Sequence, residues 1–134
     1  MQPSIEKPLA LVVDDEKPLA EIFATALERA GYRTESVNSG EAALARLAEI
    51  TPAVVVLDLT LPDVGGAEIL KEIRANPRLA KTRVIIASAQ ARQAEALRGK
   101  ADLVLIKPVD FSQLRDLAAR LRLATGPLDR DKKL

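Results

Sequence analysis

Charged and polar side chains follow four short apolar runs of the sequence, each at the point where the run ends. Asp14 and Asp15 follow the first run, Asp58 the third, Ser88 the fourth and Lys107 the fifth. Three carboxylates about 5 Å apart would repel one another by roughly 3 kcal/mol per pair at an effective dielectric constant of about 20. Such a cluster requires cations. Lys107 supplies one positive charge, and all-oxygen ligation suits Mg²⁺ or Mn²⁺, so we expect a divalent cation wherever the fold gathers these residues.

The composition excludes several other kinds of site. The chain has 134 residues, no cysteine and no histidine. Disulfides, zinc sites built from cysteine or histidine, and Ser-His-Asp triads are therefore absent. The 20 basic and 19 acidic residues give a net charge of +1, and only 2% of the residues are aromatic, so nothing favours binding to nucleic acid.

The lengths of the apolar runs and the pattern of the first residues indicate where the protein resides. No apolar run approaches the roughly 20 residues that span a bilayer, and the first residues lack the pattern of a signal peptide. A length of 134 residues is typical of one domain. We expect a soluble, cytoplasmic domain that makes no membrane contact.

The apolar runs alternate with segments of helical periodicity. The runs cover residues 9–13, 33–37, 54–57, 83–87 and 103–106, and the helical segments cover residues 16–31, 39–48, 65–76, 89–100 and 110–124. Near-continuous apolar runs are typical of parallel strands that are buried on both faces. Five strands alternating with five helices predict an α/β doubly wound fold. The carboxyl ends of its strands share one edge of the sheet, where open α/β sheets bind ligands.

Four residues mark the expected ends of helices. Pro18 suits the first turn of the first helix, and Gly31 suits its end. Ser39 and Asp110 are expected to cap the second and fifth helices, because their side chains can accept hydrogen bonds from free backbone N–H groups.

The chain resembles a response-regulator receiver domain of two-component signalling, in the CheY-like superfamily. The resemblance rests on the pair Asp14-Asp15, the stretch "DLTLPDVGG" that begins at Asp58, Ser88 with the alanine after it, and Lys107 with the proline after it. It implies a flavodoxin-like, five-stranded parallel sheet of order 2-1-3-4-5 with five helices. It covers about residues 7–124, which implies a receiver domain over residues 1–124 and a C-terminal tail or linker start over residues 125–134.

The resemblance also implies a metal site. Asp15 and Asp58 would bind Mg²⁺ directly, together with the backbone carbonyl of Thr60, and Asp14 would act through a water molecule. Mn²⁺ would fit the same oxygen ligands.

The resemblance implies that Asp58 is the phosphoacceptor, which takes a phosphoryl group from a histidine kinase, a phosphotransfer protein or a small phosphodonor. Lys107 would pair with one phosphoryl oxygen, and the hydroxyl of Ser88 would bond to another. Phosphoryl transfer depends mainly on positioning and neutralisation of charge, which these residues can supply without a histidine on this chain. The phosphoryl group would then bias an equilibrium between two loop arrangements that a partner or output domain reads.

Three positions bear on how such a domain would signal. Members of the family usually carry Tyr or Phe three residues before the lysine, where this chain has Val104. An aliphatic side chain cannot act as the usual aromatic switch, so the signal would either depend on Ser88 and backbone movement or be only weakly coupled to the output. Thr60 and Gln90 occupy the positions that tune loss of the phosphoryl group in the family. The family also implies a homodimer contact through the fourth helix, fifth strand and fifth helix.

Other functions remain open. A pseudo-receiver would act as a protein-interaction domain without phosphorylation. A phosphotransferase or phosphatase of the haloacid-dehalogenase type would carry a second Asp where this chain has Thr60. A flavin- or cobalamin-binding domain would require aromatic, histidine or glycine-rich contacts, and the first strand is followed by two acids instead. We expect a regulatory domain and not an enzyme.

Overall fold

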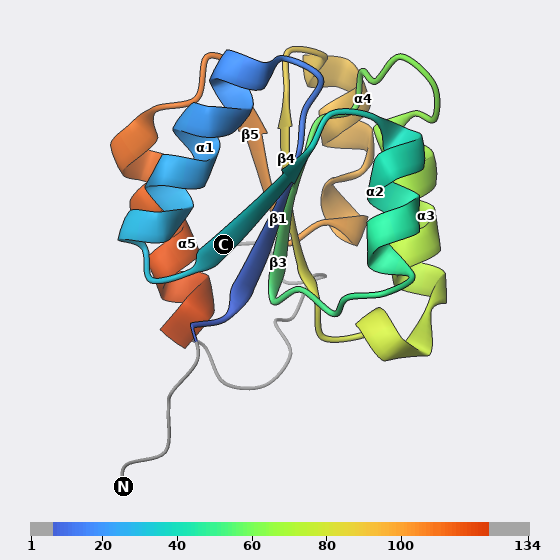
Figure 1. The fold of residues 1–134 in the computed structure, drawn as a ribbon. Helices are drawn as coiled ribbons and strands as arrows, with labels where there is room; N and C mark the ends of the chain where they lie inside the picture. Colours follow the sequence, from blue (N-terminus) through green and yellow to red (C-terminus); the bar gives the residue numbers. More distant parts are fainter. Residues whose placement is uncertain (1–6, 124–134) are drawn as a thin grey trace, which may run out of the picture.

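A single parallel sheet forms the centre of the protein, as seen in a computed structural model that describes residues 7–123 (Figure 1). Its five strands are β1 Leu9–Val13, β2 Arg33–Val37, β3 Val54–Leu57, β4 Arg83–Ser88 and β5 Leu103–Ile106. The strand order is β2-β1-β3-β4-β5, and each neighbouring pair is parallel. The predicted α/β doubly wound fold and its strand order are confirmed.

Five helices cover the two faces of the sheet. They are α1 Lys17–Arg29, α2 Gly40–Leu47, α3 Gly66–Ala75, α4 Ala91–Ala96 and α5 Phe111–Leu123, with short 3₁₀ turns η1 Pro77–Leu79 and η2 Arg98–Lys100. Helices α1 and α5 lie on one face, and α2, α3 and α4 lie on the other (Figure 1). Alternate residues of β1 point to opposite faces, so Ala10 and Val12 belong to one hydrophobic core and Leu11 and Val13 to the other. The chain therefore has a core on each side of the sheet.

The three central strands fit the predicted pattern, but the edge strands β2 and β5 do not. Every residue of β1, β3 and β4 is buried. None of the residues of β2, whose sequence is RTESV, is fully buried. The expectation that all strands are apolar runs buried on both faces is wrong for β2, and the expected burial is wrong for β5, where only Leu105 is buried and Ile106 is 40% exposed. Both are edge strands, which have a neighbour on one side only and tolerate exposed side chains.

The predicted helix ends are confirmed by local contacts. Pro18 lies in the first turn of α1, and Gly31 just after that helix has φ 105°, a left-handed conformation that glycine adopts without strain. The side chain of Ser39 accepts a hydrogen bond from Ala42 N at 3.1 Å, and that of Asp110 accepts one from Gln113 N at 2.8 Å. These caps fix where α2 and α5 begin, directly behind the carboxyl edge of the sheet.

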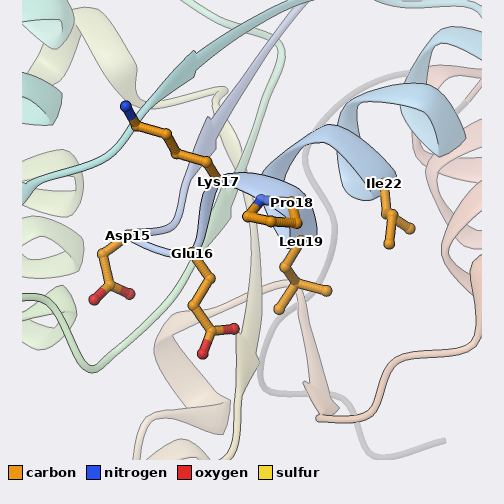
Figure 2. Close-up of a pocket in the computed structure, with 6 residues that line it drawn as sticks. All are labelled: Asp15, Glu16, Lys17, Pro18, Leu19 and Ile22. Atoms are coloured by element: carbon orange, nitrogen blue, oxygen red, sulfur yellow. The ribbon is translucent and has the colours of Figure 1, made fainter.

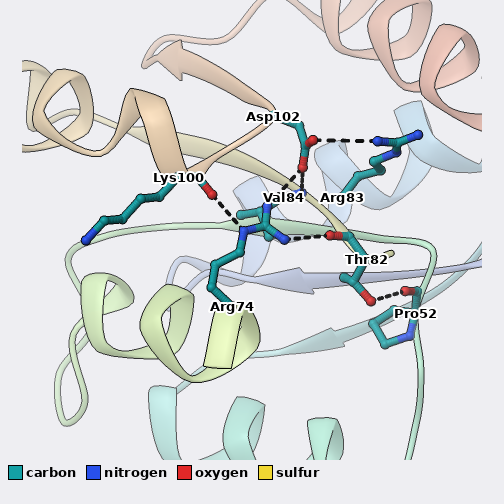
Figure 3. Close-up of polar contacts among 7 residues, drawn as sticks. All are labelled: Pro52, Arg74, Thr82, Arg83, Val84, Lys100 and Asp102. Atoms are coloured by element: carbon teal, nitrogen blue, oxygen red, sulfur yellow. Dashed lines mark hydrogen bonds and ion pairs between the residues drawn. The ribbon is translucent and has the colours of Figure 1, made fainter. Parts of the chain in front are cut away.

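A buried polar network ties the opposite edge of the sheet together (Figure 3). The Asp102 side chain has no exposed surface, and it accepts hydrogen bonds from Val84 N at 2.7 Å and Arg74 Nη2 at 3.0 Å. Arg83 Nη1 lies 3.8 Å from the other carboxylate oxygen of Asp102. Arg74 also donates to the backbone carbonyl of Thr82 at 2.9 Å. The end of α3 is thereby fixed to the beginning of β4 and β5, away from the edge that carries the predicted site.

Helix α5 is fixed to the beginning of β2. The buried hydroxyl of Tyr32 donates to the carbonyl oxygen of Ala118 at 2.8 Å, and burial raises the pKa of Tyr32 to about 12. Arg122 Nε donates to the carbonyl oxygen of Ala30 at 2.9 Å. These contacts join segments that lie about 90 residues apart in the chain.

Candidate functional site

Three carboxylates meet at the carboxyl edge of the sheet. Asp14, Asp15 and Asp58 each offer an oxygen atom, and these oxygens lie within 4.8 Å of one another. The pairing of β1 with β3 explains this proximity, because Val13 and Leu57 are partners in the parallel ladder and the acids follow them directly. Asp58 N also donates to the carbonyl oxygen of Val13 at 2.9 Å, which holds the two strand ends together.

The three acids differ in their exposure. Asp14 is 1% exposed and Asp58 is 5% exposed, whereas Asp15 is open to solvent. Each buried acid accepts one hydrogen bond from the loop after its strand. Glu16 N donates to Asp14 Oδ1 at 3.0 Å, and Thr60 N donates to Asp58 Oδ1 at 3.2 Å. The local loops therefore fix the orientation of both buried carboxylates.

Lys107 provides the positive charge between the two buried acids. Its Nζ lies 2.9 Å from Asp14 Oδ2 and 3.5 Å from Asp58 Oδ2, and its side chain is 14% exposed. Lys107 N donates to the carbonyl oxygen of Ser88 at 2.9 Å, which extends the pairing of β5 with β4 by one residue. The parallel sheet thus brings together residues from three separate parts of the sequence, as predicted.

Burial and charge shift the acid–base properties of the site. Burial raises the pKa of Asp58, and the nearby charge of Asp14 adds to this effect, whereas the hydrogen bond from Thr60 and the charge of Lys107 oppose it. Burial alone would lower the pKa of Lys107, but its hydrogen bond to Asp14 and the charges of Asp14 and Asp58 together raise it. Lys107 therefore keeps its positive charge, and Asp58 is a carboxylate whose negative charge is poorly solvated.

The chemistry of these donors fits a hard divalent cation. The acidic cluster offers only oxygen atoms, one acid faces solvent, and the others share a single lysine. Mg²⁺ prefers one or two carboxylates and retains several waters, which an open acidic cluster of this kind allows. Asp14, Asp15 and Asp58 are the side chains that would hold it.

The remaining predicted residues lie around the cluster. Ser88 is fully buried at the end of β4, and its Oγ accepts a hydrogen bond from Gln90 N at 3.0 Å. Thr60 and Gln90 are exposed. Val104 pairs with Ile86 in the β4–β5 ladder and packs, partly buried, against the core on the side of α2, α3 and α4. The roles of these residues in phosphorylation, and of the Thr60 carbonyl in metal binding, stay predictions.

Two polar residues of the loops around the site, Asn38 and Asp63, were missed by the sequence analysis. Asn38 Nδ2 donates to the carbonyl oxygen of Asp14 at 2.9 Å, and Asp63 accepts hydrogen bonds from the start of α2. Asn38 follows β2 at the same edge of the sheet, so the reasoning applied to the other strand ends would have found it. Asp63 bonds to residues about 22 positions away, and no local pattern indicates such a contact.

A pocket at the start of α1 includes Asp15, the solvent-facing acid of the cluster (Figure 2). This pocket is lined by Asp15, Glu16, Lys17, Pro18, Leu19 and Ile22. Ile22, at the far end of this pocket, is 50% exposed. Because Asp15 belongs to both features, the pocket opens next to the solvent-facing side of the cluster.

The sequence that carries these acids and the lysine matches a known family. The model of a family described as "Response regulator receiver domain" matches residues 10–119. The chain belongs to this family. Receiver domains are signalling modules and not conventional enzymes. The residues matched include the whole acidic cluster and Lys107.

Relatives of this receiver domain are regulatory and sensor proteins. It is 36% identical over 113 residues to regulatory protein AtoC of Escherichia coli (strain K12), covering 82% of the chain and 24% of AtoC. It is 38% identical over 129 residues to virulence sensor protein BvgS of Bordetella bronchiseptica, covering 87% of the chain and 10% of BvgS. The chain thus spans only about a quarter or less of the length of these two relatives.

A solved structure agrees with the fold of this receiver domain. Response regulator protein TrrA from Thermotoga maritima, solved in complex with Mg(2+)-BeF, is 28% identical and has a TM-score of 0.76. The alignment covers 85% of the chain and 98% of TrrA. Within residues 7–123, no helix is long and apolar enough to cross a membrane.

Proposed function

We propose that this receiver domain accepts a phosphoryl group on Asp58 in the presence of Mg²⁺ and thereby changes how it contacts a partner or output domain. The observation that supports this proposal best is the cluster of Asp14, Asp15 and Asp58 within 4.8 Å, with Lys107 bridging the two buried acids. A metal and a lysine together neutralise the charge that develops on a phosphoryl group during transfer.

Asp58 is the best-placed nucleophile. A carboxylate oxygen of Asp58 forms a bond to phosphorus while the bond from phosphorus to the donor's nitrogen or oxygen breaks, and the donor leaves with that electron pair. The raised pKa of Asp58 indicates a poorly solvated carboxylate, which is a better nucleophile than a hydrated one. When bound, Mg²⁺ supplies positive charge to the phosphoryl oxygens.

Lys107 and Ser88 bind the oxygens of the phosphoryl group once it is on Asp58. Lys107 Nζ already lies 3.5 Å from Asp58 Oδ2, so it can pair with a phosphoryl oxygen after a small movement. Ser88 Oγ accepts a hydrogen bond from Gln90 N, which leaves its own hydrogen to donate to another phosphoryl oxygen. A shift of Ser88 would pull on the loop before α4. Val104 carries no aromatic ring, so we assign the change of state to this loop. Thr60 and Gln90 flank the site and would tune the lifetime of the phosphoryl group.

The donor would be a sensor histidine kinase, a phosphotransfer protein or a small phosphodonor such as acetyl phosphate. Pro18, Leu19 and Ile22 form an apolar patch beside the open side of the cluster, where a protein donor could dock while presenting its phosphohistidine. Because the chain spans a small part of AtoC and BvgS, an output domain elsewhere in a longer protein, or a separate partner, would read the signal.

A pseudo-receiver is the second candidate, because Val104 departs from the aromatic residue usual in the family. Such a domain would bind partners without phosphorylation. The complete set of Asp14, Asp15, Asp58, Ser88 and Lys107 favours the phosphorylated form.

The test is the intact mass after incubation with Mg²⁺ and acetyl phosphate, for the parent and for Asp58→Asn. A gain of one phosphoryl group in the parent alone is expected. A gain in both proteins would mean that another residue is the acceptor. No gain in the parent, even with an excess of phosphoramidate as a second donor and with Mg²⁺ binding demonstrated, would favour the pseudo-receiver.

A further inference from the structure

The beginning of α2 is held by a side chain from the loop that carries Thr60. Asp63 Oδ1 accepts a hydrogen bond from Gly40 N at 2.8 Å, and Asp63 Oδ2 accepts one from Glu41 N at 2.8 Å. Ser39, the local cap of the same helix, accepts a separate bond from Ala42 N. Helix α2 therefore has a cap of its own, and Asp63 adds a connection between its own loop and the first turn of α2.

The other side of this connection reaches the acidic cluster. Asn38 Nδ2 donates to the carbonyl oxygen of Asp14 at 2.9 Å, and Asp14 N donates to the carbonyl oxygen of Val37 at 3.2 Å. The turn that leads into α2 is thus fixed to the backbone of a residue in the cluster. A loop that bonds to the start of α2, as the loop of residues 59–65 does through Asp63, is therefore held in place relative to Asp14.

Close packing restricts the loop of residues 59–65 at two points. A Cβ added to Gly40 would overlap the carbonyl oxygen of Val64 and lie 2.7 Å from its Cβ. A Cβ added to Gly66 would overlap the carbonyl oxygen of Asp58 and lie 2.7 Å from Leu59 Cα. The loop is therefore pressed against the start of α2 near its C-terminal end, at Val64, and its beginning at Asp58 and Leu59 packs closely against Gly66, the first residue of α3. Thr60, whose N–H contacts Asp58, lies between these points.

We propose that Asp63 is a positioning residue for the acidic site: its carboxylate fixes the loop of residues 59–65 to α2 and so sets the place of the Thr60 backbone beside Asp58. This inference rests on the proposed function, because the Thr60 carbonyl is a ligand only if Mg²⁺ binds there. The hydrogen bond from Glu41 N, with others from the neighbouring backbone, lowers the pKa of Asp63. Asp63 thus carries its charge at neutral pH.

The exposure of Asp63 distinguishes a positioning role from a role in stabilising the fold. Asp63 is exposed and contributes little apolar burial, and Ser39 already caps α2. Removing its carboxylate should therefore change Tm by only a few degrees and leave the two hydrophobic cores unchanged. The larger effect should fall on the geometry of the loop beside Asp58.

The test compares Asp63→Ala, Asp63→Asn and the matched control Glu68→Gln, which removes a negative charge from the first turn of the next helix. Mg²⁺ affinity is measured by titration calorimetry, the rate of phosphorylation by intact mass with acetyl phosphate, and Tm by circular dichroism. For Asp63→Ala we expect a Kd for Mg²⁺ about five- to tenfold weaker and a slower rate, since part of the stabilisation from the two lost hydrogen bonds is enough to change an equilibrium constant by about this factor. Asp63→Asn keeps a carbonyl acceptor and should recover part of the loss, and Glu68→Gln should match the parent.

A parental Kd and rate in Asp63→Ala, measured well below its Tm, would overturn the inference and leave Asp63 as a structural contact. Gly40→Ala approaches the same contact from the other side and should also weaken Mg²⁺ binding, and its effect should not add to that of Asp63→Ala. If the parent binds Mg²⁺ but takes no phosphoryl group, the proposed function fails while the Kd values still decide the role of Asp63. A parent that binds no Mg²⁺ would overturn both.

Discussion

Replacing Asp58 by Asn should stabilise the protein when no divalent cation is present. Asn has the same shape as Asp and can still accept the hydrogen bond from Thr60 N, but it carries no charge. The change removes one negative charge from a site where Asp58 is 5% exposed and a second acid, Asp14, is 1% exposed. The outcome depends on whether repulsion and burial exceed the attraction to Lys107.

The distances allow these contributions to be compared. At an effective dielectric constant of about 20, repulsion between Asp14 and Asp58, whose oxygens lie within 4.8 Å of each other, is at least roughly 3.5 kcal/mol. Asp15 faces water and adds about 1 kcal/mol. Attraction between Lys107 and Asp58 at 3.5 Å is roughly 4.7 kcal/mol on the same basis. These contributions nearly cancel, so burial of the charge decides the sign, in agreement with the raised pKa of Asp58.

Part of the burial cost is offset by the hydrogen bond from Thr60, so we expect a net gain of about 1–2 kcal/mol for Asp58→Asn at pH 7. For a domain of this size the gain corresponds to a rise in Tm of about 3–6 °C. The assay is urea unfolding followed by far-ultraviolet circular dichroism in EDTA. A variant that is less stable than the parent under these conditions would refute the reasoning, because the attraction to Lys107 would then exceed the cost of burial.

The pH dependence follows from the same shift. The pKa of Asp58 in the folded protein is raised above its ordinary value of 3.8, so the native state takes up the proton more readily than the unfolded state. The free energy of unfolding of the parent therefore falls as pH rises from the ordinary pKa through the raised value. The advantage of Asp58→Asn should be largest at neutral pH and should disappear as pH falls below about 4.

Mg²⁺ should reverse the order of stability. A ligand present at 100 times its Kd stabilises the native state by about 2.7 kcal/mol. The parent should gain this amount, and the variant, which lacks one ligand, should gain much less. Asp58→Asn should thus be the more stable protein in EDTA and the less stable one in saturating Mg²⁺.

Three further predictions concern other parts of the molecule. Lys107→Gln should lower the free energy of unfolding by about 3 kcal/mol in EDTA, and by less in Mg²⁺ because the metal replaces the lost charge. An unchanged free energy in urea unfolding would mean that the lysine acts as a solvated surface residue. Asp102→Asn should lower the free energy of unfolding by about 2–3 kcal/mol, because it removes the charge that accepts hydrogen bonds from Arg74 and Val84 N. The rate of phosphorylation at Asp58 should stay at the parental value. A slower rate would show that this network affects the site. Gly66→Ala should lower the free energy of unfolding by at least about 2 kcal/mol, because the new Cβ meets backbone atoms. A Cβ added at Gly99 has no neighbour within 4 Å, so Gly99→Ala should change Tm by no more than a few degrees. Equal effects of the two substitutions in thermal unfolding would contradict the close packing at Gly66.

Much of the fold could be predicted because its signals are local. The apolar runs of β1, β3 and β4 and the caps at Ser39 and Asp110 depend only on neighbouring residues. The strand β2 was located correctly although its sequence is polar, since the helices on either side leave only this segment between them. Its exposure could not be predicted from an apolar pattern, because that depends on its place at the edge of the sheet.

The acidic site was predictable for a different reason. Parallel strands place their carboxyl ends together, so Asp14, Asp58 and Lys107 had to meet once the strands were assigned. Contacts made by side chains across loops were not predictable in this way. Asp63 reaches the start of α2 only because of the path of its loop, and Asp102 meets Arg74 across 28 residues of sequence.

The most direct test of the central claim is to locate the phosphoryl group. The protein is incubated with Mg²⁺ and acetyl phosphate and treated with borohydride, which reduces an aspartyl phosphate to homoserine, and the peptides are then sequenced by mass spectrometry. Homoserine at position 58, dependent on both Mg²⁺ and the phosphodonor, is the predicted result. Homoserine at position 14 or 15, or at no position in a protein that binds Mg²⁺, would contradict the assignment of Asp58 as the phosphoacceptor.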